Sequence, residues 1–135
     1  MRPAGFQIQI PGRPVDLVLI EGEKLLAVKN KNSLDLISLS DRTILQSLQF
    51  PGSGSSFTGI CYSEKNRCIY LTDAKNRILI AALEENRILR WKEPIILPEP
   101  FIGGSPVPVG LVLNDTGDKL FVTLSRSNAL AVIDL

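Results

Sequence analysis

The sequence predicts an all-β fold in which one four-stranded unit is repeated three times. The clearest sign is a recurring motif, which reads NSLDLISL at 32–39, NRILIAAL at 76–83 and NALAVIDL at 128–135. Its copies begin about 44 and then about 52 residues apart, close to the spacing of four-stranded propeller blades. Similar apolar runs precede each copy in the same order, and helical spacing is not sustained over the length of a stable helix.

The runs are short, rich in Val, Ile, Leu, Tyr and Phe, and bounded by Gly, Asn, Asp or Ser, which is typical of strands. The first strands are expected at 15–20, 58–63 and 109–114, and the second strands at 24–28, 68–72 and 119–123. The recurring motif supplies the third strands, and 43–51 and 88–98 supply two fourth strands. Four antiparallel strands joined by tight turns form the blade of a β-propeller.

The segment 6–10 is expected to be another fourth strand, because Ile10-Pro11 repeats the apolar-proline ending of Phe50-Pro51 and Leu97-Pro98. We therefore predict a single propeller segment over 1–135, made of this strand D at 6–10 and three blades. Blade 1 spans about 15–50, blade 2 about 58–97, and blade 3 has three strands in about 109–135. Since propellers have about four or more blades, further blades or another copy of the chain should complete the ring.

The segment KLFVTLSRSNALAVIDL resembles the β-propeller repeat named after its Tyr-Val-Thr-Asn strand, the YVTN repeat. Phe121-Val122-Thr123 and Tyr70-Leu71-Thr72-Asp73 match that strand, whereas Leu26-Ala27-Val28 departs most from it. The Pro-rich stretch 93–108 and the order of the runs also resemble the N-terminal propeller of bacterial proteins that carry a phosphoesterase of the alkaline phosphatase superfamily. This resemblance implies a bacterial periplasmic or extracellular protein.

The composition argues against several classes of function. Lys and Arg total 15 against 14 Asp and Glu, so the chain has no overall basic charge of the kind that holds nucleic acid or an anionic membrane. The apolar runs are too short to span a bilayer, and the N-terminus lacks the apolar core of a signal peptide. With no histidine, the common catalytic triads and His-containing metal sites are excluded, and we expect no catalytic residue, metal or cofactor.

Ligands of propellers usually bind at the face formed by the loops that follow the second and fourth strands. On this chain those loops gather a locally basic rim, which would attract an anionic ligand or a protein partner. Charges scattered on loop tips for solubility are the alternative interpretation. The candidate ligand-binding residues are Arg13, Lys29, Asn30, Lys31, Asp73, Lys75, Arg77 and Arg126.

Two apolar edges are the candidate assembly surface, because an unpaired aliphatic strand is an aggregation hazard unless another strand covers it. The residues concerned are Phe6, Ile8, Ile10, Leu130, Val132, Ile133 and Leu135. The Pro-rich stretch, with Phe101 and Ile102, is either a partner-binding loop or a stiff connector. Cys61 and Cys68 lie on two arms of one hairpin, offset from each other, and are expected to be free thiols.

The sequence thus favours a non-catalytic binding or assembly module, whose partners are further propeller blades or copies of itself. The alternative is an accessory propeller of a hydrolase, phosphoesterase or lactonase-like, whose catalytic residues lie outside this chain. The absence of histidine and of an acidic cluster argues against chemistry within these residues.

Overall fold

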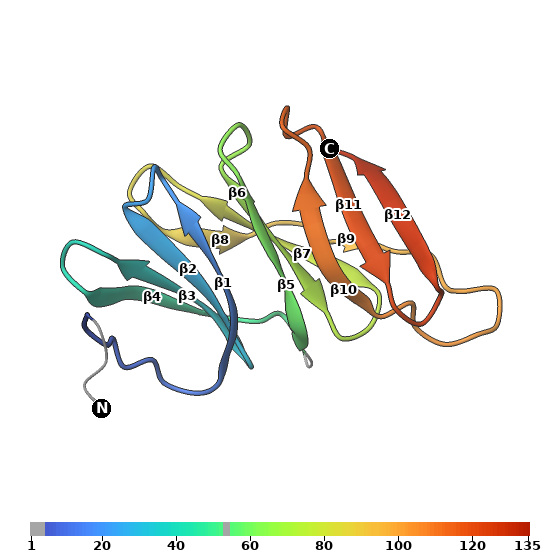
Figure 1. Ribbon diagram of the computed structural model, residues 1–135, viewed down its shortest axis with the longest axis horizontal. Helices are drawn as coiled ribbons and strands as arrows, with labels where there is room; N and C mark the ends of the chain where they lie inside the picture. The colour runs from blue at the N-terminus through green and yellow to red at the C-terminus, as the bar shows by residue number, and fades with distance from the viewer. Residues whose placement is uncertain (1–4, 53–54) are drawn as a thin grey trace.

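The computed structural model describes residues 5–52 and 55–135, and it is all-β throughout that part of the chain. Within the described residues, twelve strands form three separate antiparallel sheets that stand side by side as blades 1, 2 and 3 of a β-propeller (Figure 1). The predicted fold class is confirmed.

Blade 1 is a four-stranded meander in the order β1-β2-β3-β4. Its strands are β1 (Pro14–Ile20), β2 (Leu25–Asn30), β3 (Ser33–Ser38) and β4 (Thr43–Gln49). The second strand begins and ends later than the expected 24–28. Lys29 and Asn30 therefore belong to β2 and not to the loop that follows it.

Blade 2 follows the same order, β5-β6-β7-β8, with β9 also paired to β7. Its strands are β5 (Ser55–Ser63), β6 (Cys68–Asp73), β7 (Arg77–Leu83), β8 (Leu89–Trp91) and β9 (Ile95–Ile96). The two short outer strands both lie along β7, so the outer edge expected at 88–98 is interrupted at 92–94.

Blade 3 has three strands in the order β10-β11-β12. They are β10 (Pro108–Leu113), β11 (Lys119–Leu124) and β12 (Ala129–Asp134). Within the described residues β12 pairs only with β11, which leaves its other edge open.

The predicted strand at 6–10 is not formed in the single chain, where these residues have no strand pairing. The segment instead lies beside blade 1, with the Arg42 guanidinium 3.8 Å from the centre of the Phe6 ring. Asn30 Nδ2 also donates to the Pro11 carbonyl. Since one chain is present, pairing of 6–10 with another blade stays a prediction.

The core consists of two apolar clusters, one on each face of blade 2. Blade 1 contributes Leu34 and Leu36 to the first cluster, where they pack with Leu71 and Leu79 of blade 2. In the second cluster Tyr70 and Ile78 of blade 2 pack with Val122 of blade 3. Because both faces of blade 2 are covered, its inner strands are apolar without clean alternation.

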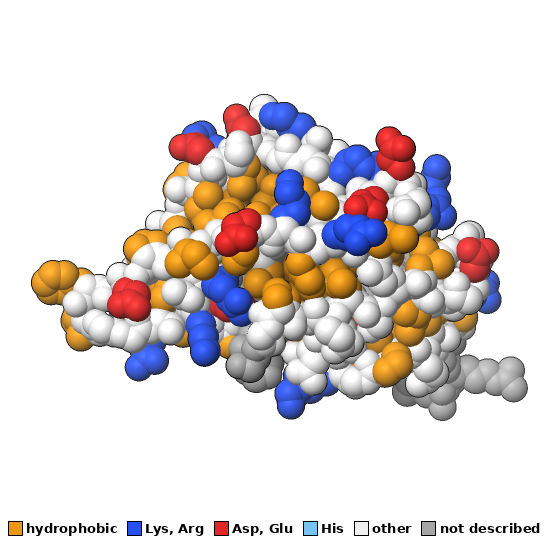
Figure 2. Space-filling view, turned by 180° about the vertical axis from the view of Figure 1, so that it is seen from behind, with side chains coloured by type: hydrophobic (Ala, Val, Ile, Leu, Met, Phe, Trp, Pro, Cys, Tyr) orange, Lys and Arg blue, Asp and Glu red, His pale blue; other side chains and the backbone are white. Residues whose placement is uncertain are grey.

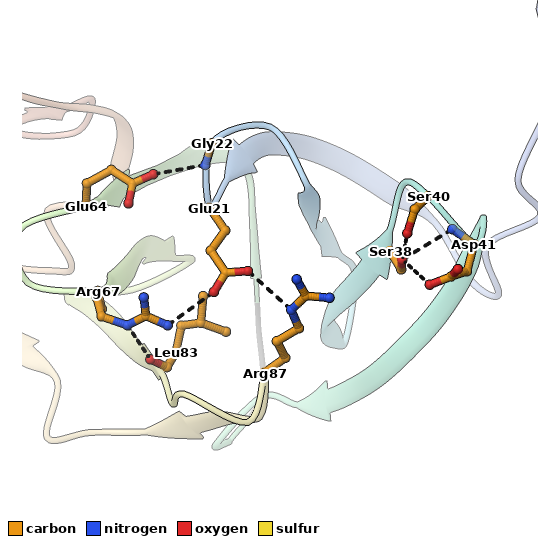
Figure 3. A network of polar contacts seen from close by, with 9 residues as sticks. All are labelled: Glu21, Gly22, Ser38, Ser40, Asp41, Glu64, Arg67, Leu83 and Arg87. Atoms are coloured by element: carbon orange, nitrogen blue, oxygen red, sulfur yellow. Dashed lines mark hydrogen bonds and ion pairs between the residues drawn. The ribbon is translucent and has the colours of Figure 1, made fainter.

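Polar contacts add to the join between blades 1 and 2 at the end opposite the loop rim (Figure 3). Glu21, in the β1–β2 turn, accepts hydrogen bonds from Arg67 at 3.3 Å and pairs with Arg87 at 3.2 Å. The Gly22 amide donates to Glu64. These groups are partly exposed, so each ion pair contributes at most about 1 kcal/mol.

Candidate functional site

Lys29 does not lie on the basic rim, because its side chain is fully buried between blades 1 and 2. Its ammonium group donates to the carbonyls of Thr58 and Thr72, each at 2.9 Å, and to Gly59 at 3.3 Å. Burial lowers the pKa of Lys29 to about 8, although Asp16 and Asp73 oppose the shift. Lys29 thus ties two blades together and is not placed to meet a ligand.

Asn30 is also buried, and it organises the approach of the chain to β1. Its amide oxygen accepts hydrogen bonds from the Arg13 amide at 2.6 Å and the Lys31 amide at 2.8 Å. Its amide nitrogen donates to Asp35 at 3.0 Å. The side chain therefore fixes two rim residues, Arg13 and Lys31, through their backbones.

Asp73 is fully buried at the end of β6 and closes the β6–β7 turn. Its carboxylate accepts from the amides of Lys75 and Arg77 at 2.8 and 2.9 Å, and from the Arg77 side chain at 2.7 Å. Arg77 also donates to the Pro51 carbonyl. Both predicted site residues are thus engaged in holding the turn.

The remaining predicted cations are exposed on the turns along the lower edge of Figure 1. Arg13 and Lys31 flank a hollow of about 300 Å³ whose lining also includes Asn32, Ser33 and Ser47. Lys75 and Arg126 lie on the corresponding turns of blades 2 and 3. The structure therefore brings Arg13 and Lys31 together, and places Lys75 and Arg126 on other blades.

The Pro-rich connection between β9 and β10 projects from blade 3 (Figure 1). Phe101 and Ile102 at its tip are almost fully exposed. Together with Arg126 and Asn128 they line a hollow of about 500 Å³. At the other end of the connection, the amide of Ser125 donates to Val107 at 3.1 Å, which fastens the loop to the β11–β12 turn.

The outward faces of blades 1 and 3 carry exposed aliphatic side chains, in contrast to the covered faces of blade 2. On blade 1, Leu17 is 59% exposed and Leu19 is 46% exposed. On blade 3, Val112 is 59% exposed, and Leu130 and Val132 of the predicted edge are 60% and 55% exposed. Hydrophobic atoms also reach the surface across the back of the molecule (Figure 2). Sequence reasoning missed Leu17, Leu19 and Val112 as exposed residues. Aligning the first strands of the three blades with one another would have shown that these residues occupy positions on the outward faces.

The other predicted edge residues are less uniform. Phe6 is 54% exposed, whereas Ile8 and Ile10 are half-buried against the chain. Ile133 points inward and packs in the second apolar cluster, so it faces blade 2. Leu135 lines a hollow of about 390 Å³ beside β12, together with Tyr70, Ile80 and Ile95 of blade 2.

Both cysteines are free, as the sequence predicts. They lie on the face of blade 2 that blade 3 covers, and burial raises the pKa of Cys61 to about 12. In the part of the chain that the structure describes, no three metal-ligating side chains come together. No helix there is long and apolar enough to cross a membrane.

Comparison of the sequence with known proteins gives no family assignment. No family model matches the chain. ATP synthase subunit delta of Bordetella avium is 33% identical over 104 residues, which are 75% of this chain and 58% of that protein. The chain thus spans less than two thirds of that relative.

Comparison of the structure finds propeller-like proteins. Kuenenia stuttgartiensis hydrazine synthase matches 99% of this chain with a TM-score of 0.72 and 14% identity. A 6-phosphogluconolactonase-like protein of Bacteroides uniformis matches 94% with a TM-score of 0.69 and 16% identity, and one of Bacteroides fragilis matches 87% with a TM-score of 0.69 and 13% identity. The chain covers 36%, 37% and 33% of these three structures. At such identities the likeness shows the fold: the chain has the architecture of about a third of a larger propeller-like protein.

Proposed function

We propose that the chain is a non-catalytic propeller module that associates with further propeller blades through the outward faces of blades 1 and 3. The observation that carries this proposal is the exposure of Leu17, Leu19, Leu130 and Val132. The equivalent repeat positions on blade 2 are buried by the two neighbouring blades. Burying such aliphatic surface is favourable by roughly 25 cal/mol per Å², which gives association a driving force.

Light scattering of the purified chain over a wide concentration range tests this proposal. The chain has a mass of 14.8 kDa, so association should give multiples of that value. A stable monomer at every concentration, with a cooperative thermal transition, would contradict the proposal.

The exposed part of the loop rim is proposed as the ligand-binding surface of the module, for an anionic ligand or an acidic partner. Arg13 and Lys31 beside the hollow support this proposal, since cations around a concave polar surface concentrate anions. Titration with inorganic phosphate, followed by amide chemical shifts, should perturb residues 12–13 and 30–33. Lys31→Glu should remove the perturbation, and Lys24→Glu, at an exposed position on the opposite turn of blade 1, should not.

The likeness to two 6-phosphogluconolactonase-like proteins supports an alternative, in which the chain is part of a lactonase-like hydrolase. Our proposal predicts that the isolated chain turns over neither a lactone nor a chromogenic phosphoester. Turnover that disappears in Asp73→Asn, with an unchanged melting temperature, would favour the alternative.

A further inference from the structure

Each blade uses the same strand positions to contact the blade that follows it. The third residue of the second strand is Ala27 in blade 1, Tyr70 in blade 2 and Phe121 in blade 3. Ala27 packs against blade 2, and Tyr70 packs against blade 3. Phe121 pairs across the sheet with Val112 and Val132, and these three form the outward face of blade 3.

The fifth residue of each second strand adds a hydrogen bond to the next blade. Lys29 donates to the Thr58 carbonyl in β5 at 2.9 Å. The Thr72 hydroxyl lies 3.2 Å from the Val109 carbonyl in β10 and 2.6 Å from the Thr58 carbonyl of its own blade, so its single proton serves both contacts. Thr123 occupies this position in blade 3, where it is exposed and bonds Gly110 of its own blade. A following blade would present a strand carbonyl to Thr123.

Strand pairing identifies the matching carbonyl on blade 1. Ile60 of β5 pairs with Leu71, Leu111 of β10 pairs with Val122, and Leu17 of β1 pairs with Val28. Thr58 lies two residues before Ile60, and Val109 lies two residues before Leu111. The equivalent residue in β1 is Val15, on the blade whose outward face carries Leu17 and Leu19.

A hollow marks the place of a fourth strand in blade 3. Between blades 1 and 2 the outer strands meet: Gln46 of β4 donates to the Leu89 carbonyl at 3.0 Å and accepts from the Leu89 amide at 2.7 Å. Between blades 2 and 3 the same region is the hollow of about 390 Å³ lined by Ile80 and Ile95. The segment 6–10 lies directly before β1, so a chain that places β1 near Thr123 brings its own 6–10 toward this hollow.

We propose that a second copy of this chain seats the outward face of its blade 1 on the outward face of blade 3, so that two chains close a ring of six blades. Thr123 then donates to the Val15 carbonyl of the second copy, and residues 6–10 of that copy pair with the open edge of β12. This inference rests on the proposed function and names its partner. Six blades fall within the range of about four to eight that propellers adopt.

Disulfide trapping tests the contact directly. A Thr123→Cys chain mixed with a Val15→Cys chain should form a covalent dimer on mild oxidation, because these positions would lie within disulfide reach, about 4.4–6.8 Å between Cα atoms. Neither variant alone should form it, and the unsubstituted chain reports on the native cysteines. Light scattering of the unsubstituted chain should give twice 14.8 kDa.

Two matched variants complete the experiment. Val132→Lys places a charge in the proposed contact and should shift the dimer to monomer, raising the dissociation constant by at least about tenfold. Ile96→Lys alters an aliphatic residue that is 62% exposed on β9, outside the contact, and should leave the dimer intact.

Association that is weakened by Val132→Lys but gives no mixed disulfide would overturn this inference and leave the proposed function standing. Association that is insensitive to Val132→Lys would overturn both. A mass of three chains would overturn the six-blade ring. A monomer at all concentrations would overturn both the inference and the proposed function.

Discussion

The two interfaces of blade 2 differ in how they are held. Toward blade 1, the apolar cluster is joined by the buried ammonium of Lys29, the Gln46 bonds to Leu89, and the ion pairs of Glu21. Toward blade 3, the interface rests mainly on apolar contact, with hydrogen bonds that include Thr72 to Val109. The comparison teaches that one repeat position can join blades through a cation or through a hydroxyl, provided that its partner is a backbone carbonyl.

The largest effect is expected in the apolar cluster between blades 1 and 2. Leu71→Ala should lower the free energy of unfolding by about 2–5 kcal/mol, because it leaves a cavity at a fully buried position facing blade 1. Urea denaturation followed by circular dichroism measures this loss. Ile96→Ala, at an exposed position outside the proposed contact, should change stability by less than about 0.5 kcal/mol, and a comparable loss there would mean that blade 2 is packed differently.

The next effect should arise where β5 of blade 2 approaches blade 3. Gly59 has a φ of 100°, and a Cβ there would lie 2.0 Å from the Val109 carbonyl oxygen. Gly59→Ala should therefore cost roughly 2–3 kcal/mol of unfolding free energy, from backbone strain and overpacking. Gly110→Ala is the matched control, because its Cβ would meet only the Thr123 hydroxyl, at 3.3 Å. Equal losses in both variants would rule out close approach of β5 and β10 as the cause.

Lys29→Met tests whether the buried ammonium of Lys29 contributes more to stability than the hydroxyl of Thr72. Since carbonyls of blade 2 lose a donor, we expect a loss of about 2 kcal/mol at pH 7, against about 1 kcal/mol for Thr72→Val. The folded pKa of Lys29 is about 8, below its ordinary value of 10.5, so the unfolded chain binds more protons between these pH values. The wild type should therefore gain stability over Lys29→Met as the pH rises from 8 to 10.5. A pH-independent difference between the two melting curves would show that Lys29 is not desolvated.

The smallest effect concerns the outer strands. Trp91 donates through Nε1 to the Gln49 carbonyl at 2.7 Å and stacks at an angle on Phe50, with ring centroids 5.8 Å apart. Trp91→Phe keeps the ring contact but removes the donor, and should cost about 1 kcal/mol. Chemical denaturation measures this change in the free energy of unfolding. A loss as large as that of Leu71→Ala would show that the outer strands dominate the interface between blades 1 and 2.

Most of the fold could be predicted from the sequence because each strand carries a local signal. The turns at 21–23, 63–67 and 114–118 separate apolar runs, and the repeat aligns the runs with one another. The predictions of strand boundaries failed where contacts with other strands, and not the local sequence, determine the end of a strand. Lys29 and Asn30 look like loop residues, yet pairing with β1 and β3 extends β2 through both of them.

The candidate site was less predictable, because charge on a turn does not reveal whether a side chain points outward. The sequence suggests a loop over 73–77, but Asp73 ends β6 and Arg77 begins β7, where they bond each other and the backbone of the turn that holds Lys75. The strand at 6–10 shows a further limit. Its alternating pattern suits a strand, and it lacks a neighbouring edge within a single chain.

The position of the two thiols makes blade 3 observable by itself. Cys68 is buried in the cluster that blade 3 shares and Cys61 is partly buried there, so both thiols should react faster with a thiol reagent when that blade swings away or when the whole chain unfolds. The dependence of the labelling rate on denaturant separates these routes, since local opening exposes little surface and varies weakly with denaturant. The protein thus contains a kinetic reporter of whether its last sheet detaches as an independent unit.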